Sequence, residues 1–316
     1  MKFTKMHGIG NNYVYFDCFS EKITHDMMSV IAEHIADRNF GIGADGAIFI
    51  CPHEDADAEM RMYNLDGSYG KMCGNGIRCV AKYIYDHGIV DSTELTIISG
   101  GEKKYLTLYV KKEEPGKSAE SSLGFNTGKK YSKRPDGMVV DMVRVDMGEP
   151  KFLPECIPVN IKEDELTDIE TPAGIKTKAA LMYPYTVDGI EYRMTCVSVG
   201  NPHAIIFVDD VKGLDLDKIG PAFEKHELFP ERVNTEFVRV IDRKNVEMRV
   251  YERGSGETLA CGTGGTAVAV ACILNGYTDN EVTVHLLGGD LIYKWDETTN
   301  HMIMTGPADY IAEGEI

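Results

Sequence analysis

Two short motifs place a cysteine immediately before a glycine-containing stretch: Cys-Gly-Asn-Gly at residues 73–76 and Cys-Gly-Thr-Gly at residues 261–264. The residues that follow each motif predict a helix, so each thiol would lie at a helix N-terminus. The unpaired N–H groups and the partial positive charge there favour an anion and lower the pKa of a thiol from about 8.5 toward neutrality. Glycines lack a Cβ and let a carboxylate approach these N–H groups closely. Each motif therefore predicts a reactive thiol beside an anion-binding site.

The two motifs belong to an internal repeat. Residues 60–68 resemble residues 248–256, and the offset of this pair, 248 − 60 = 188, equals that of the cysteines, 261 − 73 = 188. The positions identical in this register are Met60/Met248, Arg61/Arg249, Tyr63/Tyr251, Cys73/Cys261, Gly74/Gly262, Gly76/Gly264, Val80/Val268 and Ala81/Ala269. One explanation is two copies of a fold that share only structural needs. The other is a pseudo-twofold molecule whose equivalent cysteines meet at an interface between two domains.

A pair of thiols on opposite faces of one bound carbon could invert its configuration. One thiolate would remove the α-proton of an amino acid, and the opposite thiol would deliver a proton from the other side. Two helix N-termini directed at the α-carboxylate would supply fixed dipoles where the charge of the carbanion develops. This scheme requires neither a metal nor a carbonyl cofactor, and we expect neither.

Similar elements are predicted around both motifs. Residues 59–63 and 246–251 are short, rich in β-formers and partly alternating, which predicts strands. Turn residues follow, and then helices are predicted over Ile77–His87 and Thr266–Leu274. The second helix is almost wholly apolar, which is typical of a buried helix. Further short strands are predicted at Leu95–Ile98, Tyr105–Val110, Val139–Val145 and Val282–Leu287. We therefore expect an α+β fold of two pseudo-symmetric domains, each a curved, mostly antiparallel sheet wrapped around a central helix.

The length of 316 residues suggests two domains at roughly 150 residues each. We expect the first domain at 1–125, with the C-terminal segment 304–316 returning to it, and the second at 126–303. Each would carry one of the two motif cysteines. A stretch rich in Lys, Glu, Ser and Gly at 111–137 predicts a linker or an extended surface loop, and 155–178 is a second polar stretch.

Composition excludes several classes of function. The net charge of 33 − 50 = −17 argues against nucleic acid and against an anionic membrane surface as partners. The longest apolar run, Ala267–Leu274, is far shorter than the roughly 20 residues that span a bilayer, and no signal-peptide-like stretch is seen, so we expect a cytoplasmic protein. The eight cysteines include no Cys-x-x-Cys pair, which argues against a zinc site. Outside the motif positions they are expected to be reduced packing residues: Cys18, Cys51, Cys79, Cys156, Cys196 and Cys272.

With these motifs in view, the sequence resembles the diaminopimelate epimerase family over nearly the whole chain. The resemblance rests on several motifs in order: Lys5–Asn11, Gly41–Gly46, Tyr63–Ser68, Cys73–Cys79, Gly200–His203, Glu231–Asn234, Tyr251–Thr258 and Ala260–Gly264. It implies a cofactor-independent epimerase of LL- and meso-diaminopimelate in the lysine and peptidoglycan pathway. It also implies a possible homodimer, although Ala312 stands where some members have a tyrosine that supports dimer contacts.

The resemblance also implies a role for each matching residue. Cys73 and Cys261 would be the two acid/base thiols, with His203 and Glu252 beside them to tune their protonation. The reacting carboxylate would be held by the backbone N–H groups of Gly74, Asn75, Gly262 and Thr263. Glu252 and the backbone of Arg253 would meet the reacting amino group. The distal amino-acid end of the substrate would be bound by Asn64, Asn201, Asn234 and the Arg253 guanidinium, while Asn11 would help to close the pocket.

Other interpretations remain open. The same chemistry could act on proline, hydroxyproline, histidine or lanthionine, although an Arg and three Asn side chains suit a zwitterionic end group better than a ring. The two motif cysteines could instead form a redox pair, or the fold could serve only to bind an anion. Individually, His203 could be a structural histidine, Asn64 and Asn234 could be turn or cap residues, and Arg253 could be part of a surface ion pair.

Overall fold

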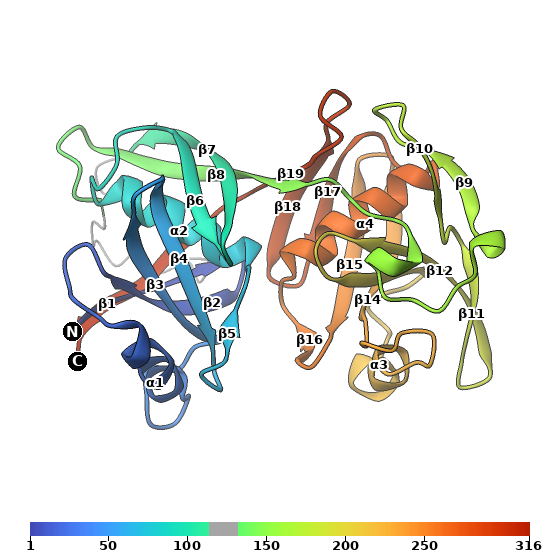
Figure 1. The fold of residues 1–316 in the computed structure, drawn as a ribbon, viewed down its shortest axis with the longest axis horizontal. Helices are drawn as coiled ribbons and strands as arrows, with labels where there is room; N and C mark the ends of the chain where they lie inside the picture. The colour runs from blue at the N-terminus through green and yellow to red at the C-terminus, as the bar shows by residue number, and fades with distance from the viewer. Residues whose placement is uncertain (114–131) are drawn as a thin grey trace. The chain divides into compact units, whose positions relative to one another are not determined.

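The computed structural model describes residues 1–113 and 132–316 (Figure 1). The chain divides into two compact units, one formed by Met1–Val145 with Thr305–Ile316 and the other by Asp146–Met304. The domain boundary expected at 125/126 lies outside the described residues, as does most of the polar stretch expected to be a linker.

Strand pairing explains which segments belong to the first unit. Strand β8 (Met138–Gly148) pairs antiparallel with β7 (Glu102–Lys112), so the residues just after the undescribed segment belong to the sheet of this unit. The C-terminal strand β20 (Asp309–Glu315) pairs antiparallel with β1 (Lys2–Gly8), which brings the end of the chain back beside its beginning.

One mixed sheet forms the frame of the first unit. Its strands pair in the order β20, β1, β2, β3, β4, β6, β7, β8. From β1 to β7 the successive pairs are antiparallel, parallel, antiparallel, parallel and antiparallel. Its other elements are β2 (Asn11–Asp17), α1 (His25–Ala36), β3 (Gly46–His53), β4 (Ala56–Asn64), β5 (Tyr69–Gly70), α2 (Gly74–Asp86) and β6 (Glu94–Ser99).

The second unit has a sheet of the same design. Its strands pair in the order β11, β12, β13, β14, β15, β17, β18, and the pairs from β12 to β18 again alternate from antiparallel through parallel to antiparallel. The elements are 3₁₀ turns at Pro154–Cys156 and Glu163–Glu165, β9 (Thr167–Glu170), β10 (Lys176–Ala179), β11 (Tyr183–Val187), β12 (Ile190–Ser198), β13 (Pro202–Phe207), α3 (Leu216–Glu224), β14 (Asn234–Asp242), β15 (Asn245–Glu252), β16 (Gly256–Thr258), α4 (Gly262–Leu274), β17 (Glu281–Leu286), β18 (Gly289–Trp295) and β19 (Met302–Gly306).

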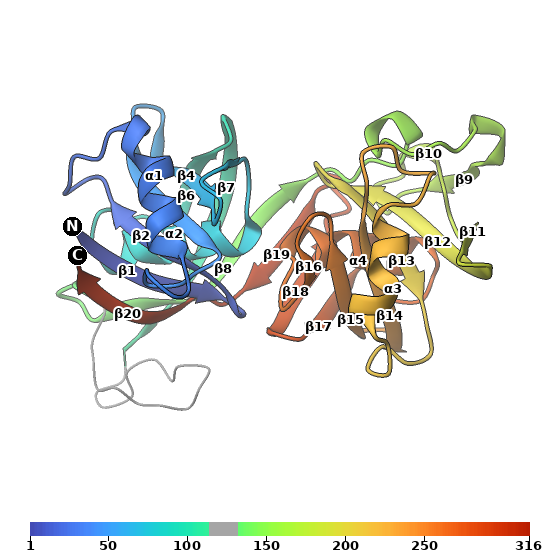
Figure 2. The same ribbon diagram turned by 90° about the horizontal axis from the view of Figure 1, so that it is seen from below.

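The shared pairing series is the structural counterpart of the sequence repeat. In each unit the chain forms a long helix after one strand and before a second strand that pairs parallel with the first. Helix α2 follows β4 and precedes β6, and helix α4 follows β15 and precedes β17. Every residue of α2 is buried, as is nearly all of α4, and each helix is enclosed by strands of its own unit (Figures 1 and 2). The expected fold class is therefore confirmed, with mixed sheets in which antiparallel pairs are the majority.

Several element boundaries differ from those expected. The helices predicted from Ile77 and Thr266 begin earlier, at Gly74 and Gly262, because a cysteine caps each one. Helices α1 and α3 were not expected. The polar stretch 155–178 coincides with the two 3₁₀ turns and the β9–β10 hairpin.

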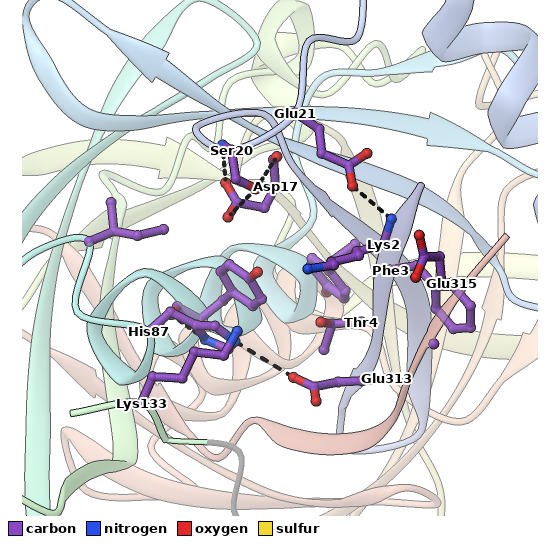
Figure 3. A pocket seen from close by; sticks show the side chains of 14 residues that line it. Lys2, Phe3, Thr4, Asp17, Ser20, Glu21, His87, Lys133, Glu313 and Glu315 are labelled. Atoms are coloured by element: carbon purple, nitrogen blue, oxygen red, sulfur yellow. Dashed lines mark hydrogen bonds and ion pairs between the residues drawn. The ribbon is translucent and has the colours of Figure 1, made fainter. Parts of the chain in front are cut away.

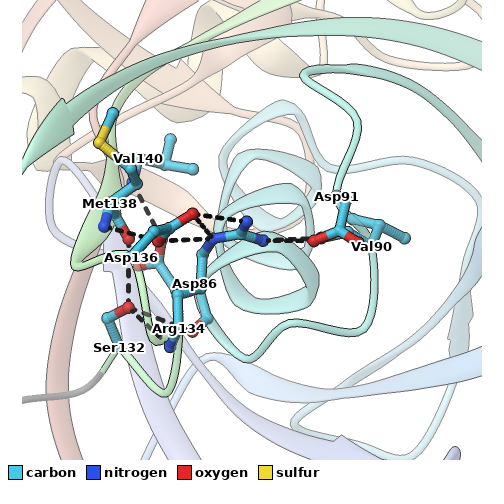
Figure 4. A network of polar contacts seen from close by, with 8 residues as sticks. All are labelled: Asp86, Val90, Asp91, Ser132, Arg134, Asp136, Met138 and Val140. Atoms are coloured by element: carbon cyan, nitrogen blue, oxygen red, sulfur yellow. Dashed lines mark hydrogen bonds and ion pairs between the residues drawn. The ribbon is translucent and has the colours of Figure 1, made fainter.

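A polar network anchors the segment before β8 against the C-terminal part of α2 (Figure 4). The Arg134 guanidinium donates to the carboxylates of Asp91 and Asp136 at 3.0 and 2.9 Å and lies over the Tyr85 ring. The Asp86 carboxylate, at the end of α2, accepts the Val140 N–H at 2.9 Å. These contacts fix the far end of the helix that begins at the first motif cysteine.

Candidate active site

Cys73 caps the N-terminus of α2. Its backbone is extended, and its Sγ accepts the Gly76 N–H at 3.3 Å. A Cβ on Gly76 would lie 2.6 Å from Ile48 Cδ1, so a larger residue in this first turn would force the Ile48 side chain of β3 to move. This capping geometry places the thiol where backbone N–H groups stabilise its ionised form.

Asn11, at the start of β2, contacts this thiol. The Cys73 thiol donates to Asn11 Oδ1 at 3.3 Å, and Asn75 Nδ2 donates to the same oxygen at 3.3 Å. Asn11 Nδ2 donates in turn to Asp45 Oδ2 at 2.9 Å, which fixes the direction of the amide. The structure thus brings together four predicted site residues of the first unit, namely Asn11, Cys73, Gly74 and Asn75.

Opposing effects act on the ionisation of Cys73. Burial raises the pKa of this thiol, whereas hydrogen bonds from Gly76 N–H and Tyr13 and the nearby Arg78 cation lower the pKa. Arg78 is fully buried on α2, where it donates to Pro307 O and Gly74 O, each at 3.0 Å. Sequence reasoning missed the role of Arg78, although a cation one turn after the motif cysteine, between the apolar residues Ile77 and Cys79, was a usable signal.

Cys261 caps α4 in the same way. Its Sγ accepts the Gly264 N–H at 3.3 Å and lies 3.5 Å from Thr263 Oγ1. Asn201, before β13, donates through Nδ2 to the same hydroxyl at 3.3 Å. A Cβ on Gly264 would lie 2.8 Å from Glu236 Oε1 and 3.1 Å from the sulfur, so a larger residue here would displace the Glu236 carboxylate and crowd the thiol.

A buried histidine–carboxylate pair lies next to this helix. His203 and Glu236 are both fully buried, and His203 Nδ1 lies 2.7 Å from Glu236 Oε1. The other ring nitrogen, Nε2, lies 3.0 Å from Asn201 Oδ1. His203 therefore has defined partners on both sides, and its orientation is coupled through Asn201 to the first turn of α4.

Two carboxylates oppose ionisation of Cys261. Burial is the main cause that raises the pKa of this thiol well above its ordinary value, and the charges of Glu252 and Glu236 add to the effect. Burial also raises the pKa of Glu252, whereas its hydrogen bond from Thr258 Oγ1 and the nearby Cys261 thiol lower it. Glu236 was missed by sequence reasoning, although an acidic residue next to apolar residues in strand β14 was a visible signal.

The residues expected to bind a distal amino-acid group occupy different settings. Asn234 is buried, donates to Pro202 O at 2.9 Å and accepts the Arg253 N–H at 2.9 Å, so its amide fixes the backbone at Arg253. The Arg253 side chain is exposed and donates to Glu231 O at 3.1 Å. Asn64 is exposed in the first unit, where its side chain donates to Ser68 Oγ at 3.0 Å in the turn after β4.

Other parts of the described chain offer no rival centre of this kind. Within residues 1–113 and 132–316, no group of three or more His, Cys, Asp or Glu side chains is placed to hold a metal ion. No helix in those residues has the length and apolar character needed to cross a membrane. A cavity of about 690 Å³ in the first unit is lined by residues such as Lys2, His87 and Glu313 and includes none of the predicted site residues (Figure 3).

Solved structures of other proteins share the fold of this chain. A phenazine biosynthesis protein of the PhzF family from Bacillus anthracis matches with a TM-score of 0.62 at 15% identity, covering 100% of this chain and 98% of that one. A hydroxyproline epimerase from Agrobacterium vitis matches with a TM-score of 0.62 at 13% identity, covering 100% and 90%. At these identities the likeness concerns the fold alone. Fold and capped helices together define the chain as a two-unit protein with the fold of these structures.

Sequence comparison is more specific. A model of the family described as diaminopimelate epimerase matches residues 3–124 and 195–311. Proteins named diaminopimelate epimerase from Agathobacter rectalis and Desulfovibrio desulfuricans are 49% and 47% identical, covering 100% of this chain and 99% and 98% of theirs. The chain belongs to the diaminopimelate epimerase family, which confirms the resemblance seen in its motifs.

Proposed function

We propose that the chain is a diaminopimelate epimerase, an isomerase that interconverts the LL and meso isomers without a cofactor. Family membership supports this activity over action on proline, histidine or lanthionine. The observation that carries the mechanism is the equivalence of Cys73 and Cys261, because each thiol caps a buried helix and accepts the N–H three residues later. Such a pair suits an enzyme that removes a proton on one face of a carbon and adds one on the other.

The proposed reaction uses the two thiols as acid and base in turn. One thiolate removes the α-proton, and the opposite thiol delivers its proton to the other face of the same carbon. The reverse reaction exchanges their roles. The α-carboxylate is held by the N–H groups of Gly74, Asn75, Gly262 and Thr263, whose helix dipoles stabilise the charge that develops in the transition state.

The two thiols have different electrostatic surroundings in this scheme. Arg78 favours the ionised form of Cys73, whereas Glu252 and Glu236 favour the neutral form of Cys261. In our proposal Glu252 also meets the reacting ammonium together with the Arg253 backbone, and His203 tunes protonation from behind Asn201. Binding a cationic ammonium beside Glu252 would offset its charge and so reduce its effect on Cys261.

Deuterium exchange tests the proposed activity directly. LL-diaminopimelate incubated with the enzyme in deuterated water, without added cofactor, should gain α-deuterium and yield the meso isomer. Cys73→Ser and Cys261→Ser should each lose at least about 10³-fold in turnover, because a serine hydroxyl is a far weaker acid than a thiol. A matched Cys156→Ser change, at an exposed cysteine, should leave turnover unchanged. Full activity in either motif variant would contradict the two-base scheme.

Arg253 tests the substrate class. We propose that its guanidinium binds the distal carboxylate with Asn64, Asn201 and Asn234, while Asn11 helps to close the pocket. Arg253→Ala should raise KM for diaminopimelate about 10- to 100-fold, the range expected for a lost charged hydrogen bond. Arg243→Ala, which removes another exposed arginine of the same unit, is the control. Equal KM values for the two variants would argue against a distal carboxylate at Arg253.

The remaining expectations stay predictions. If Cys73 and Cys261 instead formed a redox pair, activity would consist of disulfide cycling, whereas the epimerase would be inactive with these thiols joined. A cytoplasmic location and a homodimer are proposed on the resemblance. The domain limits also remain a proposal: residues 1–125 with 304–316 form the first domain, and 126–303 form the second. The compact units of the structure are Met1–Val145 with Thr305–Ile316, and Asp146–Met304.

A further inference from the structure

A second pair of cysteines lies side by side in the first unit, away from the capped helices. Strands β2 and β3 are parallel neighbours, and Asp17 pairs with Ile50 at the last described rung. Cys18 and Cys51 are the next residues of the two segments, and the Cys18 N–H donates to Ile50 O at 2.9 Å, which continues the ladder past the end of β2. The two side chains therefore project to the same face from adjacent positions.

This spacing is compatible with a disulfide. Neighbouring strands lie about 4.8 Å apart, which is within the range of roughly 4.4–6.8 Å for the Cα atoms of a disulfide. The two thiols are close enough for each to shift the pKa of the other, while the Cys51 thiol itself donates to Phe49 O at 3.8 Å. Cys51 is 5% exposed in the core cluster beneath α1, and Cys18 packs partly buried at its margin. One thiol is thus within reach of small solutes while the other is held beside it.

The surroundings favour one ionised thiol. Cys18 lowers the pKa of Cys51, whereas Cys51 raises that of Cys18; burial acts against ionisation of both thiols, and the Arg61 cation on neighbouring strand β4 favours it. Glu59 acts against ionisation at Cys51, and Asp17 does so at Cys18. A thiolate with a second thiol beside it is the arrangement that reacts with oxidants and then resolves to a disulfide.

We propose that Cys18 and Cys51 form a reversible disulfide when the protein meets a peroxide. The thiolate of one of the two cysteines attacks one oxygen of hydrogen peroxide, the O–O bond breaks, and a sulfenic acid on that cysteine and hydroxide form. The sulfur of the other cysteine then attacks the sulfenic sulfur, the S–O bond breaks, and water leaves. Overall the two thiols lose two electrons and two protons, and one peroxide becomes two waters.

The disulfide would close a loop that contains the whole of α1. Such a cross-link restricts the unfolded chain and stabilises the folded unit. Neither cysteine belongs to the proposed acid/base pair, so this modification is independent of the epimerase proposal. Reductants that carry thiols would reverse it by thiol–disulfide exchange.

Peptide mapping of the full-length protein tests the proposal. Trypsin cuts after Lys5, Lys22, Arg38 and Arg61, so Cys18 is the only cysteine of peptide 6–22 and Cys51 the only cysteine of peptide 39–61. The reduced protein would be treated with a few equivalents of hydrogen peroxide, alkylated, and digested without reductant. We expect mass spectrometry to find these two peptides joined, and dithiothreitol to separate them. Cys73 and Cys261 lie in other tryptic peptides, so their oxidation is scored separately.

Variants and unfolding provide the controls. Cys156→Ser should retain the cross-link, whereas Cys18→Ser and Cys51→Ser should lose it. Oxidised protein should show a Tm roughly 5–10 °C higher for the transition of the first unit, reversed by dithiothreitol. Recovery of peptides 6–22 and 39–61 as separate alkylated species, at a peroxide dose that oxidises exposed Cys156, would overturn the proposal without reliance on any variant.

Discussion

Glu236 and Arg78 give the two capping thiols different chemical surroundings. Both side chains are fully buried, one beside Cys261 and the other beside Cys73. A buried carboxylate near a thiol disfavours the thiolate, and a buried guanidinium favours it. The sequence repeat makes the two thiols equivalent in backbone geometry, and these single residues make them unequal in proton affinity.

The effect of Glu236 can be measured by its neutral analogue. Glu236→Gln removes a negative charge that helps to raise the pKa of Cys261, so the thiolate should form at lower pH. The pH midpoint for alkylation of Cys261, followed by mass spectrometry, should fall by about 0.5–1 unit. Glu227→Gln, at an exposed position of the same unit, should leave it unchanged. An unchanged or higher midpoint in Glu236→Gln would contradict this account.

At this scale the sequence could predict residues that act through their type and spacing. The two cysteines cap the helices, and Asn11, Asn75, Asn201 and Thr263 lie next to the capped ends, while their expected roles in binding substrate stay predictions. Glu236 and Arg78 could not be assigned from spacing, because their effect depends on burial and on which backbone segment they meet. Asn64 was expected to bind substrate from its place in a motif, but its described side-chain hydrogen bond is to Ser68 in a turn, and spacing alone could not distinguish these two roles.

The central helices are held by close packing of glycines as well as by their caps. A Cβ on Gly265 of α4 would lie 2.3 Å from Tyr293 Oη, and that hydroxyl donates to Gly262 O at 2.9 Å. The tyrosine on β18 thus occupies the space that glycine leaves and satisfies a carbonyl of the first turn. At position 265, helix propensity therefore favours alanine, whereas packing against Tyr293 favours glycine.

Replacing Gly265 by alanine tests whether helix propensity or packing against Tyr293 has the larger effect on stability. Alanine would gain about 1 kcal/mol of helix propensity, but the overlap with Tyr293 requires a shift that typically costs about 1–3 kcal/mol. Gly265→Ala should therefore lower the free energy of unfolding, measured in urea, despite its better propensity. Thr266→Val, which replaces the hydroxyl bonded to Gly262 O by a methyl group and keeps the other methyl, serves as a comparison in the same turn. A more stable Gly265→Ala protein would contradict the packing argument.

Element types were more predictable than element limits. The strands of the repeat are confirmed, because their β-rich residues lie on buried faces of the sheets. The helices begin earlier than predicted since glycines lower propensity and the thiol caps supply the missing hydrogen bonds. Helix α1 buries Met28, Ala32, Ile35 and Ala36 at helical spacing, a signal that was present but missed, whereas Pro221 inside α3 obscures its pattern.

The two units differ in how the chain builds them. The second unit is one continuous segment, 146–304, whereas the first needs the C-terminal residues 305–316. Those residues supply β20 as the partner of β1, and Pro307 O accepts a hydrogen bond from buried Arg78. Loss of the segment would leave a sheet edge unpaired and a buried guanidinium without that acceptor.

Fragments should reflect this difference. A 146–304 fragment should unfold cooperatively on heating when followed by circular dichroism, because its own strands form its sheet. A 1–145 fragment should show no cooperative transition, or one at least about 10 °C below that of the full chain. A 1–145 fragment as stable as the full-length first unit would mean that β20 and Arg78 contribute little.

The main chain almost closes on itself in the first unit. The Met1 amino group donates to Ile316 O at 2.5 Å, and the Ile316 N–H donates to Met1 O at 2.9 Å, so both termini lie together (Figure 2). A few residues of peptide could join them into a ring, and new ends could be opened at the Asp188–Gly189 turn between β11 and β12. In such a circular permutant the first unit would become a single uninterrupted stretch of chain, and the second would become the divided one.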